Sequence, residues 1–458
     1  MAARIPAVPT ARARSRAGGA GGAGAVLARR SVLGLFGLAA LTACGADGGG
    51  SGGGGGKTVT LDFLSYNYGT PDLGGQGTQK LIDAFHAANP DIRIRPQGVA
   101  VKDVLTKLRT DTAAGNPPDV AQIGWSKMAE AYANLPLVPV QDLVSPADWQ
   151  AHVAGMSRGV LDAVRHDGKV KAMPYTMSIP VLFYNADLFR KAGLDPDRAP
   201  RTVAEIKDAA LAVTRTGAQG VYFAVADAGK SDYLTQSVIA SNGGTLLRPD
   251  GSPAVADPAA VGALTVLQDL TVSGAAPAVS ANDPLAAFAG GKLAMIVLST
   301  AALTNFEKAA NGKFDLRTAG FPRFTDAPAR PTYSGAGLAV LTKDKARQRA
   351  AWRFVAFLTG AQGFTVITRD MGYLPLRPAL VTDPAHLADY FAQNKRLLPA
   401  LDQLDAVTPY TFFPGRSANQ AVLALQDEAV EPIVLRKADP ARTLNEAASK
   451  IRSLASRS

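Results

Sequence analysis

Side chains that could catalyse a reaction or hold a metal ion are few and scattered along this chain. The four histidines, at positions 86, 152, 166 and 386, include no pair at metal-ligand spacing. Cys44 is the only cysteine, so thiol catalysis and sulfur metal sites are excluded, and no G-x-S-x-G nucleophile elbow occurs. A carboxylate pair for glycoside hydrolysis stays open, because it needs only proximity in space. Together these absences favour a binding protein, with neither cofactor nor metal, over an enzyme.

Cys44 has a different chemistry open to it. It ends the segment RRSVLGLFGLAALTAC at 29–44, in which two arginines precede a short apolar run. A membrane-spanning helix needs about 20 apolar residues, so this run fits the core of a signal peptide instead. The final residues LTAC match the lipobox of bacterial lipoproteins. We therefore predict a signal peptide over 1–43 and a diacylglycerol on the thiol of Cys44.

The positive charge of the chain is concentrated in the same segment. Residues 1–43 hold six arginines and no acidic residue, so they supply +6 of the formal +10 and leave +4 for the rest. The rest has no basic cluster interleaved with aromatic residues, so we expect no nucleic-acid binding. The paired arginines also allow a twin-arginine signal, and export by the Sec or the Tat route stays open.

A glycine-rich linker at 44–56 follows the predicted cleavage point and is expected to act as a flexible tether. The segment SGGGGGKT at 51–58 superficially resembles a phosphate-binding loop, but it lacks the first glycine and follows no strand. About 400 residues come after it, enough for two lobes, and no later apolar run reaches a membrane-spanning length. We expect an exported globular body, held on the outer face of the cell membrane by the lipid on Cys44.

The body alternates between the residue periods of strands and of helices. We expect strands at 58–63, 92–94, 119–123, 179–184 and 221–225, and helices at 78–88, 101–108, 202–213, 262–272, 350–358 and 417–435. Thr202 and Glu205 have capping-box spacing, and Asp250-Gly251 indicates a turn. Strands and helices in alternation indicate α/β layers with mainly parallel strands.

Four stretches of the body occur in an order that is typical of a known family. They are MPYTMSIPVLFYNADLFRKAGLD at 173–195, NGGTLLRPDG at 242–251, FAGGKLAM at 288–295 with the Ser-Thr pair at 299–300, and GAGLAV at 335–340 with AWRFVAFL at 351–358 and GYLPLR at 372–377. As an ordered set they resemble the family 1 extracellular solute-binding proteins, which are the lipoprotein or periplasmic receptors of ABC importers.

The resemblance implies a type II-like periplasmic-binding fold, with two α/β lobes, a hinge and a ligand between the lobes. The first lobe would comprise 57–184 plus 335–372, and the second 185–334 plus 373–458. Closure of the lobes would bury the ligand by shifting an existing equilibrium. The closed receptor would then dock on ABC permease subunits, near which the tether keeps it at high effective concentration.

Within the family, the chain looks most like receptors for glycerol 3-phosphate and glycerophosphodiesters. Positions that line their pocket match Ser178, Ser299, Thr300, Tyr333, Gly335, Tyr373 and Arg416 of this chain. One position departs from the pattern. Those receptors place a glutamate after a Gln-hydrophobic pair, whereas this chain has Gln122-Ile123-Gly124-Trp125.

Trp125 and Arg416 have more than one interpretation, and two tyrosines are further pocket candidates. Trp125 offers a stacking surface for a sugar face or a quaternary ammonium, or it caps the sheet as a core residue. Tyr66 and Tyr68 follow the first strand, and ligands bind at the carboxyl ends of strands. Arg416 precedes the 417–435 helix, whose first N–H groups favour an anion. It is otherwise an ordinary surface arginine, or it pairs with a carboxylate such as Asp405.

Three functions follow in order of preference. The first is a substrate-binding lipoprotein of an ABC importer for a sugar or oligosaccharide, because the lost carboxylate and the added indole suit a sugar face. The second is a receptor for glycerol 3-phosphate or a glycerophosphodiester. The third is an exported enzyme or adhesion protein on a similar two-lobe body.

Overall fold

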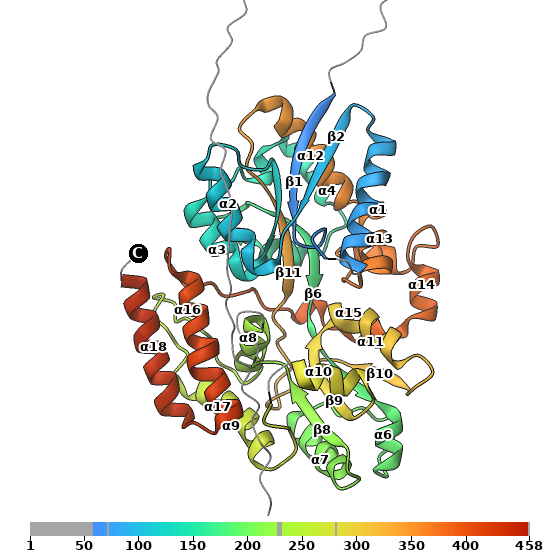
Figure 1. The fold of residues 1–458 in the computed structure, drawn as a ribbon, viewed down its shortest axis with the longest axis vertical. Coiled ribbons are helices and arrows are strands. Elements are labelled where there is room, and N and C mark those ends of the chain that lie inside the picture. Colours follow the sequence, from blue (N-terminus) through green and yellow to red (C-terminus); the bar gives the residue numbers. More distant parts are fainter. Residues whose placement is uncertain (1–57, 71–72, 227–230, 280–281, 457–458) are drawn as a thin grey trace, which may run out of the picture. The chain divides into compact units, whose positions relative to one another are not determined.

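A computed structural model describes residues 58–70, 73–226, 231–279 and 282–456 (Figure 1). The predicted signal peptide, Cys44 and the glycine-rich linker lie outside the described residues, so they stay predictions. Within the described ranges, no helix has both the length and the apolar character needed to cross a membrane.

The first of the two large sheets has five strands in the order β2-β1-β3-β11-β6. Their bounds are β1 Val59–Ser65, β2 Ile92–Gly98, β3 Val120–Gly124, β6 Met173–Ser178 and β11 Ser334–Val340. β1 runs parallel to β2 and β3, whereas β11 is antiparallel to β3 and β6. Every residue of β6 is buried, as expected for a strand covered on both faces.

The helices of this first lobe cover the sheet. They are α1 Leu73–Ala88, α2 Val104–Ala113, α3 Trp125–Asn134, α4 Pro146–Val153, α5 Arg158–Ala163, α12 Lys345–Leu358 and α13 Ala361–Met371. α12 packs on β1 and also contacts α1 and α13. The rings of Phe63 and Phe85 both meet Phe354 edge to face, at 5.2 and 5.0 Å between centroids. This geometry adds to the energy of simple burial. A short hairpin, β4 Arg165–His166 with β5 Lys169–Val170, lies in the same part of the chain.

The second sheet has four strands in the order β10-β7-β9-β8. Their bounds are β7 Pro180–Asn185, β8 Gln219–Phe223, β9 Leu293–Ser299 and β10 Leu316–Ala319. β8 and β9 are parallel, whereas β7 is antiparallel to both β9 and β10. Each sheet is therefore mainly parallel with one reversed strand. In the first sheet this is β11, and in the second it is β7.

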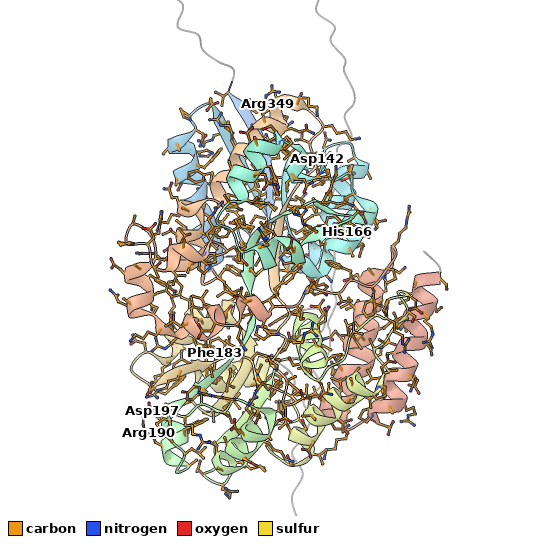
Figure 2. All side chains as sticks on the ribbon, turned by 180° about the vertical axis from the view of Figure 1, so that it is seen from behind. Asp142, His166, Phe183, Arg190, Asp197 and Arg349 are labelled. Atoms are coloured by element: carbon orange, nitrogen blue, oxygen red, sulfur yellow. The ribbon has the colours of Figure 1, made fainter. Side chains whose placement is uncertain are left out.

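The second lobe has more helices than the first. They are α6 Ala186–Lys191, α7 Val203–Thr214, α8 Asp232–Ser241, α9 Pro258–Val272, α10 Asn282–Ala289, α11 Leu303–Ala310, α14 Ala388–Gln393, α15 Leu398–Leu401, α16 Ala418–Leu425, α17 Glu431–Arg436 and α18 Pro440–Ser456. α16, α17 and α18 lie beside α8 and α9 (Figure 1). Phe183 of β7 is fully buried and packs on Phe288 and Phe306 (Figure 2).

The chain passes between the two sheets at several points. A single residue, Ile179, separates β6 of the first sheet from β7 of the second. The chain returns between β10 and β11, and it leaves the first lobe again after α13, which Gly372 ends in a left-handed conformation. The sequence-based division into 57–184 plus 335–372 and 185–334 plus 373–458 stays a prediction.

Most of the expected elements are present, and one C-terminal helix was not among them. The capping box of Thr202 and Glu205 forms at the start of α7. The helix expected at 417–435 is present as a continuous run of α16, a π turn over Gln426–Val430 and α17. α18, which follows it, was not expected. Its apolar residues Leu444, Ala447, Ala448 and Ile451 recur at helical spacing and pack towards α9 and α16, so the sequence did carry a signal for this helix.

Candidate ligand-binding cleft

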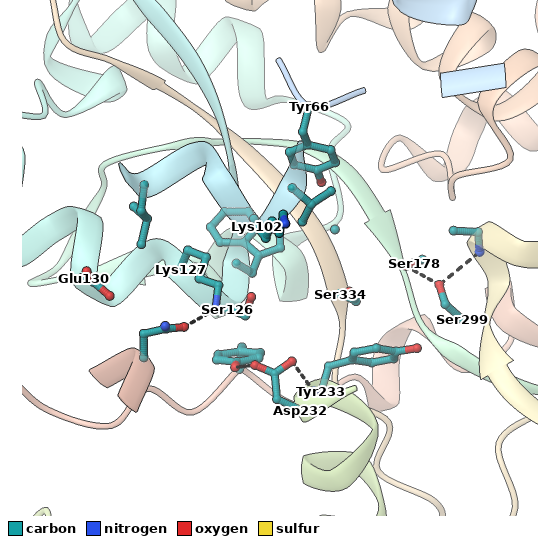
Figure 3. A pocket seen from close by; sticks show the side chains of 18 of the residues that line it. Tyr66, Lys102, Ser126, Lys127, Glu130, Ser178, Asp232, Tyr233, Ser299 and Ser334 are labelled. Atoms are coloured by element: carbon teal, nitrogen blue, oxygen red, sulfur yellow. Dashed lines mark hydrogen bonds between the residues drawn. The ribbon is translucent and has the colours of Figure 1, made fainter. Parts of the chain in front are cut away.

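A cavity of about 450 Å³ lies between the two sheets. It is bordered by residues at the carboxyl ends of four strands: Tyr66 after β1, Gly124 of β3, Ser178 of β6 and Ser299 of β9. Parallel strands bring their carboxyl ends to one edge, where ligands bind in open α/β sheets. The volume is within the range of small-molecule sites, and the two lobes share its lining (Figure 3).

Five aromatic side chains line the cavity: Tyr66, Trp125, Tyr233, Tyr373 and Tyr410. Trp125 begins α3 and is only 1% exposed. Its ring meets Tyr333 edge to face at 5.7 Å, and its indole N–H has no hydrogen-bond partner among the described residues. The two interpretations of Trp125 therefore hold together, because it packs in the core of the first lobe and also borders the cavity.

A buried hydrogen-bond network fixes the strand end that carries Tyr66. The Gln122 side-chain oxygen accepts from Ser65 Oγ at 2.7 Å and from the Asn67 backbone N–H at 3.3 Å. These bonds join the end of β1 to β3. Burial raises the pKa of Tyr66 well above its ordinary value, so its phenol stays neutral and keeps its O–H as a donor.

Serine hydroxyls and a glycine backbone form one side of the cavity. Ser299 Oγ donates to Ser178 Oγ at 2.8 Å, and this bond joins the second lobe to the first. Gly335 has φ +114°, in the region that favours glycine, and lies opposite Met177 of β6, just before the register change between Ala336 and Gly337. A Cβ atom there would lie 2.0 Å from the Thr176 carbonyl oxygen. Glycine therefore lets the backbone of β11 reach the cavity.

Charged side chains gather at the end of the cavity near α3 and α8. Lys127 of α3 donates to the Asn419 side-chain oxygen of α16, and Tyr410 donates to the carboxylate of Asp232. Burial lowers the pKa of Lys127 and raises that of Asp232, and their mutual attraction opposes both shifts. Arg109 pairs with the buried Glu130.

Six of the nine residues predicted to bind ligand line this cavity, and three do not. The six are Tyr66, Trp125, Ser178, Ser299, Gly335 and Tyr373. Thr300 is buried beside the cavity, and its backbone N–H donates to Ile179 O at 2.9 Å. Tyr333 is fully buried behind Trp125 and donates its hydroxyl to Ala163 O at 3.1 Å.

Arg416 and Tyr68 also lie outside the cavity lining. Arg416 is exposed, and among the described residues it makes no ion pair, with Asp405 or any other carboxylate. The predicted ligand contacts of the nine residues stay predictions, but the geometry favours the six over Thr300, Tyr333 and Arg416.

Sequence reasoning missed the residues that the second lobe brings to the charged end. These are Asp232, Tyr233, Tyr410 and Asn419. One signal was available: Asp232 and Tyr233 begin the helix that leads into the NGGTLLRPDG stretch. Within the described part of the chain, no three His, Cys, Asp or Glu side chains gather as a metal site requires.

Two α/β lobes with a polar, aromatic-lined cavity between them define a solute-binding receptor. The chain belongs to the bacterial extracellular solute-binding protein family, whose sequence profile matches residues 41–363. Members of this family are receptors that work with ABC permeases.

Its relatives include the sn-glycerol-3-phosphate-binding periplasmic protein UgpB of Escherichia coli (strain K12), which is 27% identical over 399 residues, or 82% of this chain and 88% of the relative. The crystal structure of UgpB from Mycobacterium tuberculosis in complex with glycerophosphocholine is 26% identical, with a TM-score of 0.74 over 89% of this chain and 99% of that one. The cyclic alpha-maltosyl-1,6-maltose binding protein from Arthrobacter globiformis shares the fold, with 23% identity and a TM-score of 0.73 over 87% and 100%.

Proposed function

We propose that this chain is the substrate-binding lipoprotein of an ABC importer that captures a sugar or oligosaccharide between its lobes and delivers it to a permease without converting it. The lining of the cleft carries this proposal. Trp125 and the tyrosines offer apolar faces for sugar rings, and Ser178 and Ser299 offer hydroxyls for hydrogen bonds. Sites that bind small polar molecules combine such surfaces with a few placed polar groups.

A glycerophosphodiester is the second candidate ligand, and two observations favour it. UgpB proteins that bind sn-glycerol 3-phosphate or glycerophosphocholine are relatives at 26–27% identity. Lys102 also lines the cavity, and among the described residues it has no ion pair or hydrogen bond. An unpaired ammonium at the cleft would favour a phosphate.

Isothermal titration calorimetry of the full chain tests both candidates. Maltose, maltotetraose, sn-glycerol 3-phosphate and glycerophosphocholine are titrated at low and at high salt. We expect the protein to bind ligands of only one of the two classes, sugars or glycerophosphate compounds, with one ligand per protein. The ligand should be recovered intact. Binding of a phosphate ligand should weaken as salt increases, whereas that of a neutral sugar should not change. Conversion of the ligand during the titration would instead support the exported enzyme.

Lipidation of Cys44 is tested separately by cell fractionation. Cys44→Ala should move the protein from the membrane fraction to the medium, because the thiol that takes the lipid is absent. Ser51→Ala, in the linker seven residues further on, is the control and should stay with the membrane. If Cys44→Ala also stays with the membrane, the protein is not anchored through this cysteine.

A further inference from the structure

The charged end of the cleft contains a buried carboxylate, that of Asp232, which the sequence analysis did not predict. The structure brings Asp232 to the cavity from the start of α8 in the second lobe. We infer that Asp232 and Lys127 form a two-sided clamp for a pair of adjacent hydroxyl groups on the ligand. The inference rests on the proposed function and names the part of the ligand that this end of the cleft recognises.

Asp232 is held in place and keeps acceptor capacity. Its side chain is 5% exposed. One carboxylate oxygen accepts from the Tyr410 hydroxyl, and the other accepts from the Tyr233 backbone N–H at 2.9 Å. A carboxylate has about four lone-pair sites, so these two bonds leave room for two ligand hydroxyls. Figure 3 shows the carboxylate of Asp232 at the border of the cavity.

The segment that carries Tyr410 is itself fixed to α8. The Gln236 side chain donates to Thr411 O at 3.1 Å and accepts from Thr411 N at 2.8 Å. The tyrosine that orients Asp232 is therefore held by the same helix, one turn further along. A clamp for hydroxyls needs such fixed acceptors, because directional bonds lose strength quickly when their geometry is loose.

Lys127 supplies the donor side of the clamp. Its ammonium has three N–H donors, and the Asn419 side chain takes one of them. Its charge is attracted to Asp232 and to Glu130, but Glu130 is already paired with Arg109. Two donors of Lys127 therefore remain for a ligand at the cavity.

The balance of charge at this end suits neutral hydroxyls. A phosphate placed here would meet the carboxylate of Asp232, and a ligand ammonium would meet Lys127. A hydroxyl group both donates and accepts, so it can donate to Asp232 and accept from Lys127. Two adjacent hydroxyls occur on a sugar ring and on a glycerol unit alike, so the clamp fits the shared chemistry of both candidate ligands.

The two sides of the clamp come from different lobes. Lys127 is on α3, which packs on β3 and β11 of the first sheet. Asp232 is on α8, which packs on α9 in the second lobe, and Asn419 is on α16, which contacts both α3 and α18. The clamp is therefore complete only when the lobes come together, and hydroxyl binding and closure stabilise each other.

Calorimetry of the full chain with Asp232→Asn tests the inference, with maltose and glycerophosphocholine as probes. The variant keeps the shape of the side chain and removes its charge. For the probe that the wild type binds, we expect affinity to fall about tenfold or more, because charged hydrogen bonds are lost. Asp405→Asn, an exposed carboxylate outside the cavity, is the control and should bind as the wild type does.

Ligands without the hydroxyl pair separate direct contact from a structural role. O-phosphocholine lacks the glycerol hydroxyls, and monodeoxy maltoses lack one hydroxyl in turn. Against O-phosphocholine, or against the deoxy sugar that has lost the clamped hydroxyl, the wild type and Asp232→Asn should bind alike. If Asp232 has only a structural role, Asp232→Asn should lower the affinity for every ligand by the same factor. That result would overturn the clamp.

Lys127→Met is the second variant, because Lys127 is partly exposed on α3 and its replacement keeps Asp232 with its bonds to Tyr410 and Tyr233. It should show the same ligand-dependent loss even if Asp232→Asn does not fold. Binding of either probe within twofold of the wild type by both folded variants would reject the clamp and leave the proposed function standing. If the wild type binds neither probe, the ligand classes of the proposed function fail, and the clamp fails with them.

Discussion

Gly335 and Gly124 both border the cavity, but only Gly124 has room for the methyl group of an alanine. A Cβ at Gly335 would lie 2.0 Å from the Thr176 carbonyl oxygen and 3.0 Å from Met177 Cα, and φ is +114°. Because backbone atoms block the methyl, β11 must move away from β6. Backbone strain of about 1–3 kcal/mol and one or two ladder bonds at about 1 kcal/mol each give a loss of roughly 2–5 kcal/mol for Gly335→Ala.

Gly124→Ala is the matched comparison. Its φ of −61° and ψ of 141° suit alanine, and the nearest atom to the new Cβ, Gly335 O, is 3.8 Å away. The gain from a stiffer unfolded chain and the cost of alanine at the start of α3 are each below about 1 kcal/mol and nearly cancel. Gly124→Ala should therefore unfold within about 1 kcal/mol of the wild type.

Urea denaturation followed by circular dichroism measures both free energies of unfolding. Equal midpoints for Gly335→Ala and the wild type would show that the close approach of β11 to β6 at this position does not need glycine, and the argument from the Cβ contact would be refuted. Calorimetry on Gly124→Ala adds a functional readout. Its methyl group points into the open space of the cavity, so ligand affinity should fall although the fold is intact.

Two further predictions concern single side chains. Burial and the nearby Arg377 lower the pKa of His152 to about 4. The unfolded chain then binds more protons than the folded chain between about pH 6.5 and pH 4. The free energy of unfolding should therefore decrease as the pH is lowered across that window, by up to about 3 kcal/mol. His152→Gln should flatten this pH dependence in thermal melts, and parallel curves would exclude His152 as the cause. Trp125→Phe removes an indole N–H that has no partner, which offsets the lost ring area. Its free energy of unfolding should lie within about 1 kcal/mol of the wild type, and a loss of 3 kcal/mol in urea denaturation would contradict this.

Features that depend on residues close together in the sequence could be predicted. The charged end of the cleft could not, because it depends on contacts between residues far apart in the sequence. The capping box needs only Thr202 and Glu205, which are three residues apart, and it forms as expected. The position of Tyr66 at the cavity followed from its place after the first strand, and that of Ser178 followed from the family resemblance. Asp232 meets Tyr410 across 178 positions, and Lys127 meets Asn419 across 292. No local period records such pairings, so this end of the cleft was missed.

The place of Arg416 shows the same limit from the other side. Its segment was expected to open one long helix whose N–H groups face a ligand. The helix begins at Ala418, one residue later than expected, and Asn419 and Leu423 border the cavity whereas Arg416 is exposed. Helical spacing fixes which residues share a face, but packing of α16 against α3 and α18 decides which face meets the cleft.

The position of β11 sets an order in which the lobes can fold. β11 lies between β3 and β6, so the first sheet stays divided until the chain reaches Val340. β7 to β10 span only Pro180 to Ala319, so the second sheet has all its strands earlier. Joining β11 to β3 closes a loop of about 200 residues, and such distant pairings are slow to form. A chain that emerges from the ribosome amino end first can therefore complete its second sheet before its first.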